Sequence, residues 1–582
     1  MDWSATGIHL IWWPTNPAGR PDRIPHVTEN KRQSRIPRGW TRPALGALSG
    51  LLAGFAALAV AELTAVWVRP QAGPVIAVGG AAIDRTPAQV KDWAIRNFGT
   101  ADKLILQLGI LVVLVLFAMA LGVLAVRYRR SGAAGVLLLG AVGAAAAVGR
   151  PDSTGLEDAL PSVAGAGVAA VLLFRLVGRL GAGGPRARLP APAGVGPSET
   201  AAGAGARTGA GTDHPSGGQD WDRRGFVIAA TAVAAASAGT GLLGRGLDGL
   251  RSREAVASRA DVVLPAPVSR ANAIPRGARL RVPGVSPFTT PNRDFYRVDT
   301  ALVVPRVDAT TWKLRIHGDG VARPVTLSFD DLLRRELIER DITLTCVSNA
   351  VGGPYVGNAR WTGVRLADLL AECGVLPPSR GGPADQLVAR SVDGMTIGSP
   401  VEDVMDGRDA LLAVGMNGRP LPFAHGFPAR MVVPGLYGYV SACKWVKDLE
   451  LTSFDAYDAY WVERRWARKA PVKTQSRIDT PRPFARPRAG AVVVAGVAWA
   501  QHRGIDKVEV RVDDGPWQEA RLAAEDSRDT WRQWSFDWQA VKGGHTLSVR
   551  ATDRTGAVQT EQRTGTVPDG ATGRHSVVVT VG

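Results

Sequence analysis

Four long apolar stretches in the N-terminal third of the chain constrain its fold more than any other feature of the sequence. A helix needs about 20 mostly apolar residues to cross the hydrocarbon core of a bilayer. The stretches approach or exceed this length and cover residues 44–68, 104–126, 132–149 and 160–180. The sequence therefore predicts a four-helix transmembrane region over residues 44–180, behind a cytoplasmic N-terminal tail of residues 1–43.

The cationic residues that flank these stretches predict their orientation, because short loops rich in lysine and arginine stay on the cytoplasmic side. The flanking cations are Lys31, Arg32, Arg35, Arg38, Arg42, Arg127, Arg129, Arg130, Arg175 and Arg179. They all fall on one side of the membrane when the N-terminus is cytoplasmic. The connection 69–103 and the acidic turn 152–158 are then expected on the outer side.

A second membrane signal follows a segment that has no apolar periodicity. Residues 181–222 are rich in Gly, Ala and Pro, which is typical of a flexible linker. Arg223 and Arg224 then open a weakly apolar run to residue 248. This run resembles a twin-arginine export signal placed inside the chain, and the alternative interpretation is an ordinary fifth transmembrane helix. Both interpretations put the part of the chain after a linker at 249–275 on the extracytoplasmic side of the cell membrane.

The charge of the chain does not indicate nucleic-acid binding. A formal net charge of +17 would by itself suit a polyanion. The apolar stretches give the arginines a role in membrane topology instead, and we expect no nucleic-acid partner. None of the eight histidines lies in a predicted helix, and the three cysteines form no C-x-x-C motif. The sequence therefore predicts neither a haem nor an iron–sulfur cluster on this chain.

The second half of the chain consists of short strand-like runs separated by Gly, Pro, Asn and Asp. We expect a mixed α+β domain over residues 276–480 and an all-β, immunoglobulin-like sandwich over residues 481–582. The expected strands are 312–317, 342–346, 491–495, 508–512, 534–538 and 546–551, and the expected helices are 328–340 and 366–373. A connector formed by residues 460–465 and 473–479 is expected to pack between the two domains rather than to contact a substrate.

Cys346 is the residue most suited to chemistry. It ends a strand-like run and is followed by a loop rich in Gly and Asn, so its sulfur is placed to face a ligand. A buried, inert cysteine is the alternative, and a Cys346–His425 nucleophilic pair of a thiol hydrolase is another. Cys373 and Cys443 lie in apolar patterns and are expected to be core residues.

Five ordered motifs show a resemblance to the sulfite oxidase family of molybdenum enzymes. The motifs are TCVSN at 345–349, GNARWTGV at 357–364, HGFPAR at 425–430, VPGLYG at 433–438 and SACKW at 441–445. The similarity extends over about residues 276–582 and includes the immunoglobulin-like dimerisation domain of that family. It implies a homodimer through the C-terminal sandwich.

The resemblance implies a molybdenum ion held by one pyranopterin dithiolene and one cysteine thiolate, with Cys346 at the metal-ligand position. Residues that match cofactor-binding positions are Asn292, Phe295, Tyr296, His425, Arg430, Ser441 and Lys444, of which Arg430 and Lys444 are expected at the pterin phosphate. The expected catalytic residues are Cys346, Arg297, Asn349 and Arg360.

The sequence departs from the sulfite-oxidising members in ways that bear on the substrate. Arg297 is followed by Val-Asp-Thr where those members carry Asn-His, and Ala350 stands where they carry an arginine. Sulfite is an anion and requires cationic side chains at the site. Arg360 is a nearby candidate to replace the missing arginine, but a neutral S-oxide or N-oxide is an alternative substrate.

The sequence thus leads to one main hypothesis and two alternatives. The main hypothesis is a multi-pass, membrane-anchored molybdopterin oxidoreductase. It transfers an oxygen atom to or from a small sulfur compound and exchanges electrons with a separate haem or quinone partner. The first alternative is a reductase of S-oxides or N-oxides on the same fold. The second is a non-catalytic anchored scaffold that binds partner proteins.

Overall fold

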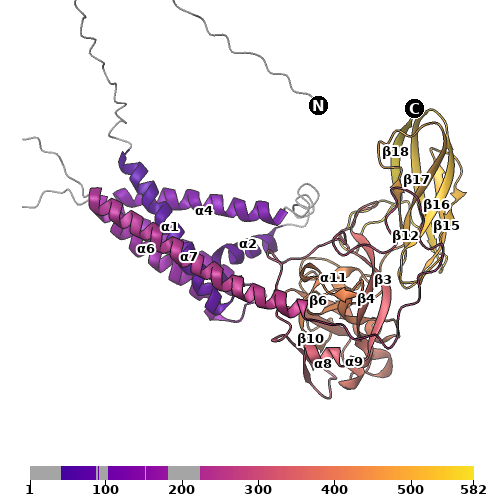
Figure 1. Ribbon diagram of the computed structural model, residues 1–582, viewed down its shortest axis with the longest axis horizontal. Coiled ribbons are helices and arrows are strands. Elements are labelled where there is room, and N and C mark those ends of the chain that lie inside the picture. Colours follow the sequence, from indigo (N-terminus) through magenta and orange to yellow (C-terminus); the bar gives the residue numbers. More distant parts are fainter. Residues whose placement is uncertain (1–40, 87–89, 91–101, 151–152, 181–222) are drawn as a thin grey trace, which may run out of the picture.

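The computed structural model describes residues 41–86, 90, 102–150, 153–180 and 223–582. The described residues form an elongated helical region, a mixed α/β part that joins one end of it, and a β-rich C-terminal part beyond (Figure 1). The expected tail 1–43 and linker 181–222 lie almost wholly outside the described residues.

The four apolar stretches all form helices, close to the predicted bounds. The long helices of the region are α1 (Thr41–Val68), α4 (Asp102–Arg127), α5 (Arg129–Val148), α6 (Leu160–Leu180) and α7 (Arg223–Ala260). Five helices are long and apolar enough to cross a membrane by length and composition. The short elements of the region are α2 (Pro74–Arg85), η1 (Pro70–Ala72) and η3 (Leu156–Ala159), and the sequence did not predict α2.

Small residues allow these helices to approach one another closely. Helix α1 packs against α4, α6 and α7. A Cβ atom added at Gly50 of α1 would lie 1.9 Å from the carbonyl oxygen of Ala118 in α4, so only glycine fits at this crossing. Close backbone contact through Gly and Ala is typical of helix packing in lipid, where apolar burial between helices provides little driving force.

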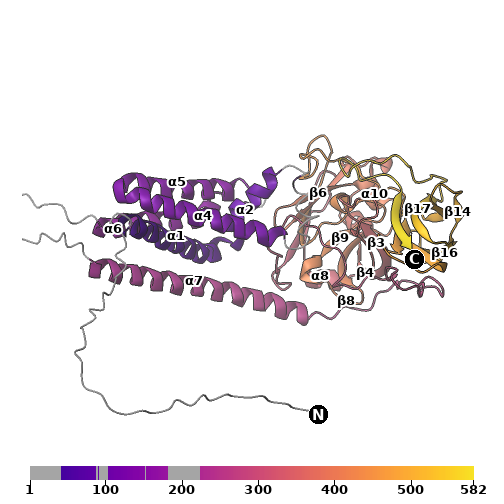
Figure 2. The same cartoon turned by 90° about the horizontal axis from the view of Figure 1, so that it is seen from above.

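Helix α7 runs along the outside of the helical region and continues past residue 248 to reach the mixed α/β part (Figures 1 and 2). The starts of α1 and α7 and the end of α6 lie at the end of the region away from the α/β part, whereas α2 lies close to it (Figure 1).

Two five-stranded sheets form the mixed α/β part. One has the order β2-β1-β10-β5-β6, and the other has the order β3-β4-β7-β8 with β9 paired to β7. The strands are β1 (Lys313–Gly318), β2 (Val325–Ser328), β3 (Leu337–Thr345), β4 (Val356–Arg365), β5 (Gln386–Ser391), β6 (Thr396–Pro400), β7 (Leu411–Met416), β8 (Arg419–Pro420), β9 (Arg430–Val432) and β10 (Val446–Thr452). The helices are α8 (Phe329–Leu333), α9 (Leu366–Glu372), α10 (Val401–Met405), α11 (Gly438–Ser441), η4 (Pro378–Arg380) and η5 (Phe423–His425).

The predicted helix 328–340 is wrong in its second half. Ser328 and Asp331 form the expected capping box, but α8 ends at Leu333. Leu337 and Ile338 begin β3 instead, where both are buried in the core and pair with β4. Burial against the sheet therefore overrides the local helical pattern.

The C-terminal part contains two four-stranded sheets, with orders β11-β12-β16-β15 and β14-β13-β17-β18. Its strands are β11 (Gln475–Thr480), β12 (Gly490–Trp499), β13 (Ile505–Val512), β14 (Gln518–Glu519), β15 (Arg521–Leu522), β16 (Arg532–Ala540), β17 (Gly543–Asp553) and β18 (His575–Val581). All pairings within the two sheets are antiparallel. Val494 and Trp534 of the first sheet share one apolar core with Val508 and Val549 of the second.

Candidate active site

Cys346 lies on the wall of a cavity of about 330 Å³. It directly follows β3, and its backbone amide donates to the carbonyl of Tyr355, 3.0 Å away, at the start of the return to β4. The last paired residues of this antiparallel hairpin are Thr345 and Val356. The hairpin therefore holds the cysteine at the end of a rigid strand pair, as the sequence predicted.

Three aromatic side chains form one side of the cavity. Phe295 stacks on Tyr296 with ring centroids 5.2 Å apart, and His425 meets Phe295 edge to face at 5.6 Å. A Cβ atom at Gly357 of β4 would lie 2.9 Å from the Phe295 ring, so glycine is required there. Burial raises the pKa of Tyr296 far above its usual value, which keeps its hydroxyl protonated.

His425 presents one nitrogen atom as a hydrogen-bond acceptor. Burial, aided by Arg430, lowers the pKa of His425 to about 4, so the ring is neutral at pH 7. Its Nε2 lies 2.8 Å from the backbone carbonyl oxygen of Asn292, and a carbonyl can only accept, so Nε2 carries the hydrogen. Nδ1 is therefore left with a lone pair. Asn292 is itself held by Asn417, whose side-chain nitrogen donates to Asn292 Oδ1 at 2.6 Å.

Arg430 is a buried cation that pairs with no carboxylate among the residues the structure describes. Only 5% of the residue is exposed. Its Nη1 donates to the carbonyl of His425 at 3.2 Å, its guanidinium lies 4.9 Å from the centre of the Trp361 ring, and its buried Nε has no partner. Burial lowers the pKa of Arg430 to about 10, which still leaves it charged at pH 7.

Lys444 and two carboxylates complete the polar part of the wall. Lys444 Nζ lies 2.8 Å from Asp299 Oδ2 and 4.7 Å from the centre of the Trp445 ring. Trp445 has a φ angle of 50°, a left-handed conformation that is costly for a bulky residue and is found where function requires it. Burial raises the pKa of Asp393, which also lines the cavity, and nearby Asp299 adds to the effect.

These features fit the cofactor that the sequence indicates. An uncompensated buried arginine is unfavourable alone and favourable beside an anion, so Arg430 suits a phosphate group. The Cys346 thiol is a soft donor suited to molybdenum. Both line one cavity whose volume lies in the usual range for small-molecule sites.

Comparison with known proteins agrees with this geometry. A family described as "Oxidoreductase molybdopterin binding domain" matches residues 301–461. The chain is 31% identical over 303 residues to mitochondrial sulfite oxidase of Mus musculus, which covers 45% of this chain and 55% of that protein. It is 32% identical over 154 residues to the uncharacterized oxidoreductase YuiH of Bacillus subtilis (strain 168), and this alignment covers 26% of this chain and 71% of YuiH. The chain belongs to the sulfite oxidase family.

The chain spans about half the length of the curated sulfite oxidases that it matches. Among solved structures, it is similar to the sulfane dehydrogenase SoxCD from Paracoccus pantotrophus, with 25% sequence identity and a TM-score of 0.44. That match covers 56% of this chain and 96% of SoxCD.

The structure brings six of the family-matched residues together and leaves five away from the cavity wall. Those on the wall are Phe295, Tyr296, Cys346, His425, Arg430 and Lys444. Asn292 lies off the wall, and its backbone carbonyl orients His425 by accepting a hydrogen bond from Nε2. The Asn349 side chain accepts from the amide of Tyr355 at 2.8 Å and so orders the cysteine loop. The hydroxyl of buried Ser441 donates to the carbonyl of Leu436 at 3.1 Å.

The two remaining arginines do not take the expected substrate role in this structure. Arg360 forms an ion pair with buried Asp341, with nitrogen–oxygen distances of 2.6 and 3.0 Å, and also donates to the carbonyl of Asn272. It is not on the cavity wall, so it does not replace the arginine missing at Ala350. Arg297 lies 3.7 Å from Asp299 and is also absent from the wall.

Several wall residues were not predicted. Met395, Tyr439, Trp461 and Trp466 form an apolar side of the cavity. The aromatic run after residue 460 was a usable signal for this side, although the connector was interpreted as packing alone. Ile83, Thr86, Val90 and Leu106 also line the cavity and come from the helical region. No local pattern in the sequence links these four residues to Cys346.

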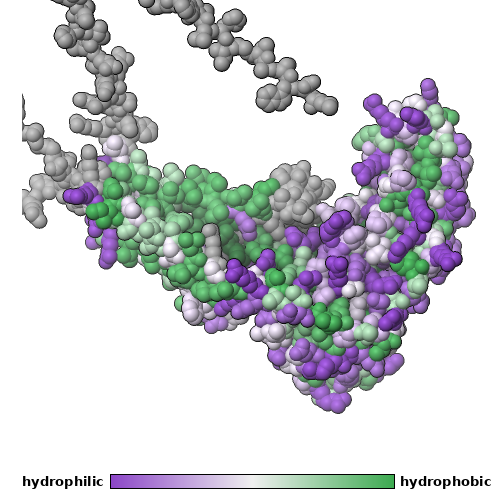
Figure 3. Space-filling model, viewed as in Figure 1, coloured by the Kyte–Doolittle hydropathy of each residue, from purple (hydrophilic) through white to green (hydrophobic). Residues whose placement is uncertain are grey.

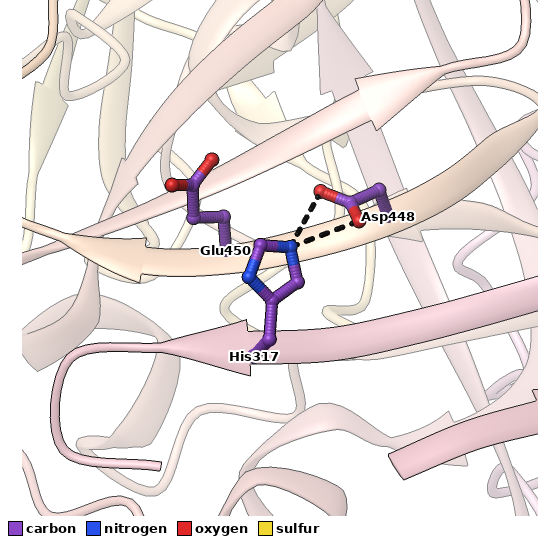
Figure 4. Close-up of side chains that lie close together, drawn as sticks. All are labelled: His317, Asp448 and Glu450. Carbon is purple, nitrogen blue, oxygen red and sulfur yellow. Dashed lines mark hydrogen bonds and ion pairs between the residues drawn. The ribbon is translucent and has the colours of Figure 1, made fainter. Parts of the chain in front are cut away.

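A second polar cluster lies on the other five-stranded sheet (Figure 4). His317 of β1 faces Asp448 and Glu450 of β10, and its Nε2 lies 3.0 and 3.2 Å from the two Asp448 oxygens. Their potential ligand atoms lie within 4.8 Å of one another. However, Arg390 lies 3.4 Å from Glu450 and 4.0 Å from Asp448, and His317 contacts Asp448, so each carboxylate already has a partner within the protein. We therefore treat the cluster as a structural ion-pair network.

Proposed function

We propose that this chain is a membrane-anchored molybdopterin oxidoreductase that transfers an oxygen atom to or from a small sulfur compound. The observation that carries the proposal is that the Cys346 thiol and the buried Arg430 guanidinium both lie on the wall of one cavity. A pterin cofactor that ends in a phosphate and binds a metal requires a soft ligand and an anion site together.

Each wall residue has a distinct role in this proposal. Cys346 would bind the metal through its thiolate, and Arg430 would bind the phosphate together with Lys444. Neutral His425 would accept a hydrogen bond from a pterin N–H at Nδ1, while Phe295 and Tyr296 support the cofactor from the side. The bound group supplies the two-electron oxygen-transfer chemistry.

The reaction can run in either direction with balanced atoms and electrons. Oxidation of sulfite takes an oxygen atom from water and releases two electrons and two protons. Reduction of a sulfoxide consumes two electrons and two protons and releases water. Both directions need a redox partner separate from the substrate.

The wall charges favour the second candidate, a reductase of neutral S-oxides or N-oxides. Among the described wall residues, Arg430 and Lys444 are the permanent cations, and the proposed phosphate occupies both. Asp299 stands on the same wall, and its negative charge opposes the binding of an anion such as sulfite. The commitment of Arg360 to Asp341 leaves no arginine in place of Ala350.

The proposed cofactor can be tested by metal analysis of the full chain purified in detergent. We expect about one molybdenum per chain, lost in Cys346→Ala because the thiolate ligand is gone. Cys373→Ala is the matched control, since Cys373 is buried in the core and does not line the cavity. Molybdenum that persists in Cys346→Ala, or a scaffold that never binds it, would contradict the proposal.

The substrate class can be tested on the same preparation with an artificial electron carrier. We expect higher kcat/KM for dimethyl sulfoxide or trimethylamine N-oxide as oxidant than for sulfite as reductant. Faster turnover of sulfite would reject the reductase candidate and favour oxidation of sulfite as the reaction.

The helical region supports a membrane location for this enzyme. The starts of α1 and α7 lie at the end of the helical region away from the cavity (Figure 1), so the two ends of five spans would face opposite sides of a bilayer. The arginines that flank the spans favour the end away from the cavity as the cytoplasmic one. Protease accessibility in intact cells tests this orientation. If Arg223 and Arg224 form a twin-arginine export signal, changing both to lysine should leave the mixed α/β part and the β-rich C-terminal part in the cytoplasm. If α7 is an ordinary fifth transmembrane helix, the change should not alter their location.

A further inference from the structure

The cavity at Cys346 is completed by the helical region. Ile83 lies in the last turn of α2, Thr86 follows that helix, and Leu106 lies near the start of α4. All three share the wall with Cys346. The helical region therefore does more than anchor the chain, because it supplies part of the site itself.

Specific contacts hold α2 against the α/β part. The Tyr460 hydroxyl donates to Asp84, which neighbours Ile83, and Trp461 follows directly on the cavity wall. A Cβ atom at Gly79 would lie 2.9 Å from Leu302 Cδ1, so the helix backbone itself packs against the α/β part. The connector at 460–465 thus joins the helical region to the cavity.

Helix α7 makes a second junction between the same two regions. Arg259 Nε and Nη2 donate to the carbonyls of Leu421 and Pro420 at 2.7 and 2.9 Å. The hydroxyl of Ser258 accepts from the amide of Ala309 at 3.2 Å. Two separate helices, α2 and α7, therefore join the helical region to the α/β part, which lie next to each other in both views (Figures 1 and 2).

The part of the cavity wall that comes from the helical region is mostly apolar. It lies next to an exposed hydrophobic surface of that region. Leu106 is part of the candidate span Leu104–Arg127, whose neighbouring residues Ile105 and Leu108 are 43% and 53% exposed. The surface of the helical region is predominantly hydrophobic up to the α/β part (Figure 3). In a bilayer, the cavity would therefore lie close to the level where hydrocarbon begins.

A few polar groups are set into this apolar wall. The hydroxyl groups of Thr86 and Thr300 already donate, to the carbonyl of Ala82 at 2.7 Å and to Asp393 Oδ2 at 3.5 Å. The indole N–H of wall residue Trp466 is buried and has no partner among the described residues. Aromatic side chains at Tyr439, Trp461 and Trp466 offer flat surfaces. An apolar aromatic site with one unpartnered indole N–H donor suits a flat, neutral ring that carries hydrogen-bond acceptors.

We propose that this side of the cavity binds a lipid-soluble quinone, which serves as the redox partner directly from the membrane. The inference rests on the proposed function and names its partner. The quinone takes up two electrons and two protons to become a quinol when substrate is oxidised, and a quinol releases both when substrate is reduced. These numbers match the two electrons and two protons of the oxygen-transfer reaction. The raised pKa of buried Asp393 agrees with a carboxyl group that can hold one of these protons.

The test uses the full chain in lipid nanodiscs and a photoreactive azidoquinone with an isoprenoid tail. Labelled peptides are mapped by mass spectrometry, and a non-photoreactive quinone serves as competitor. Leu106→Trp fills the cavity from α4, and Ile105→Trp places the same side chain on the exposed face one residue earlier. We expect labelling in α2, in α4 or at 460–466, and a loss of affinity of about tenfold or more in Leu106→Trp only.

The outcomes separate this inference from the proposed function. Labelling confined to outward-facing helix surfaces, labelling that the competitor does not reduce, or equal binding by both tryptophan variants would overturn the quinone site. Thermal unfolding of both variants shows whether they remain folded, and if Leu106→Trp does not, Leu106→Gln takes its place against Ile105→Gln. Molybdenum content is measured on the same samples, so a cofactor-free chain that still binds quinone at the cavity rejects only the proposed function.

Discussion

Arg360 on β4 and Arg430 on β9 belong to the same sheet but stand in opposite environments. Arg360 is partly exposed and forms a two-bond ion pair with Asp341, one of whose oxygens it approaches to 2.6 Å. Arg430 is buried, has no carboxylate partner among the described residues, and leaves its Nε unpaired. Charge is therefore balanced internally in the region behind β4 and left unbalanced beside Cys346.

This difference distinguishes structural charge from charge that awaits a ligand. An uncompensated buried cation costs stability unless another group supplies the opposite charge. A chain can carry that cost where binding of an anion removes it. The same reasoning separates the cavity from the His317 cluster, where Arg390 and His317 already partner the carboxylates.

The largest effect is expected from Arg430→Met, and it should fall on the cofactor. Removing one partner of a buried charge pair costs about 4 kcal/mol, so the pterin should be lost on purification. The cofactor-free chain should not lose stability, because no carboxylate is left unpaired. Pterin fluorescence after oxidation measures the first effect, and thermal unfolding of cofactor-free protein measures the second. Retention of pterin would contradict the role of Arg430 in binding the cofactor. Unfolding of the cofactor-free variant would show that Arg430 stabilises the fold, as Arg360 does.

Arg360→Met is expected to show the reverse pattern. It leaves Asp341 buried without its partner, and the free energy of unfolding should fall by about 3 kcal/mol. Molybdenum per folded chain should not change, because Arg360 is off the cavity wall. Arg334→Met is the control, since the Arg334–Asp331 pair is exposed and its removal should leave the free energy of unfolding almost unchanged. A selective loss of molybdenum in Arg360→Met would show that this arginine does reach the site.

Two histidines with lowered pKa values, buried His425 and partly buried His575, extend the comparison at a smaller scale. His425 faces the cavity, while His575 lies behind the cysteine loop, where a Cβ atom at Gly352 would approach its ring to 2.1 Å. Burial, with a smaller contribution from Arg477, lowers the pKa of His575 from 6.5 to about 4. Between these values the unfolded chain binds a proton that the folded chain does not. Stability should therefore fall as the pH drops from 8 to 5, by up to about 2 kcal/mol from this residue.

His575→Gln tests this pH dependence. Glutamine can still accept the hydrogen bond that the amide of Ile478 donates to His575 Nδ1 at 3.0 Å, but it does not titrate. Urea unfolding of the full chain in detergent at pH 8 and pH 5 should show a smaller acid loss in the variant. If the free energy of unfolding falls equally in both proteins between pH 8 and pH 5, the pKa of His575 is not lowered by folding.

The sequence predicts features of this molecule that depend on local pattern. The apolar stretches become α1, α4, α5 and α6 because length and hydrophobicity suffice to define them. Cys346 follows a strand because its neighbours alternate and pair as a hairpin. The shared position of Phe295, Tyr296, His425, Arg430 and Lys444 came from ordered family motifs, not from any pattern that physics alone makes visible.

Features that depend on contacts between distant segments could not be predicted. The role of Arg360 is decided by Asp341 on the neighbouring strand, and the end of α8 is decided by burial of β3. Helix α2 is short, with small residues where it packs, so its composition does not reveal that Ile83 reaches the cavity. The composite wall exists only once α2, α4 and residues 460–466 have folded together.

That composite wall affects how the protein can be studied. A soluble fragment that begins after α7 would keep Cys346, His425 and Arg430 but would lack Ile83, Thr86 and Leu106. Its aromatic side chains at Trp461 and Trp466 would face water, and hydrophilic reagents would reach a site that the intact chain shields. Turnover numbers from such a fragment would describe a site that is open to solvent on one side. Its substrate range would be broader than that of the complete protein.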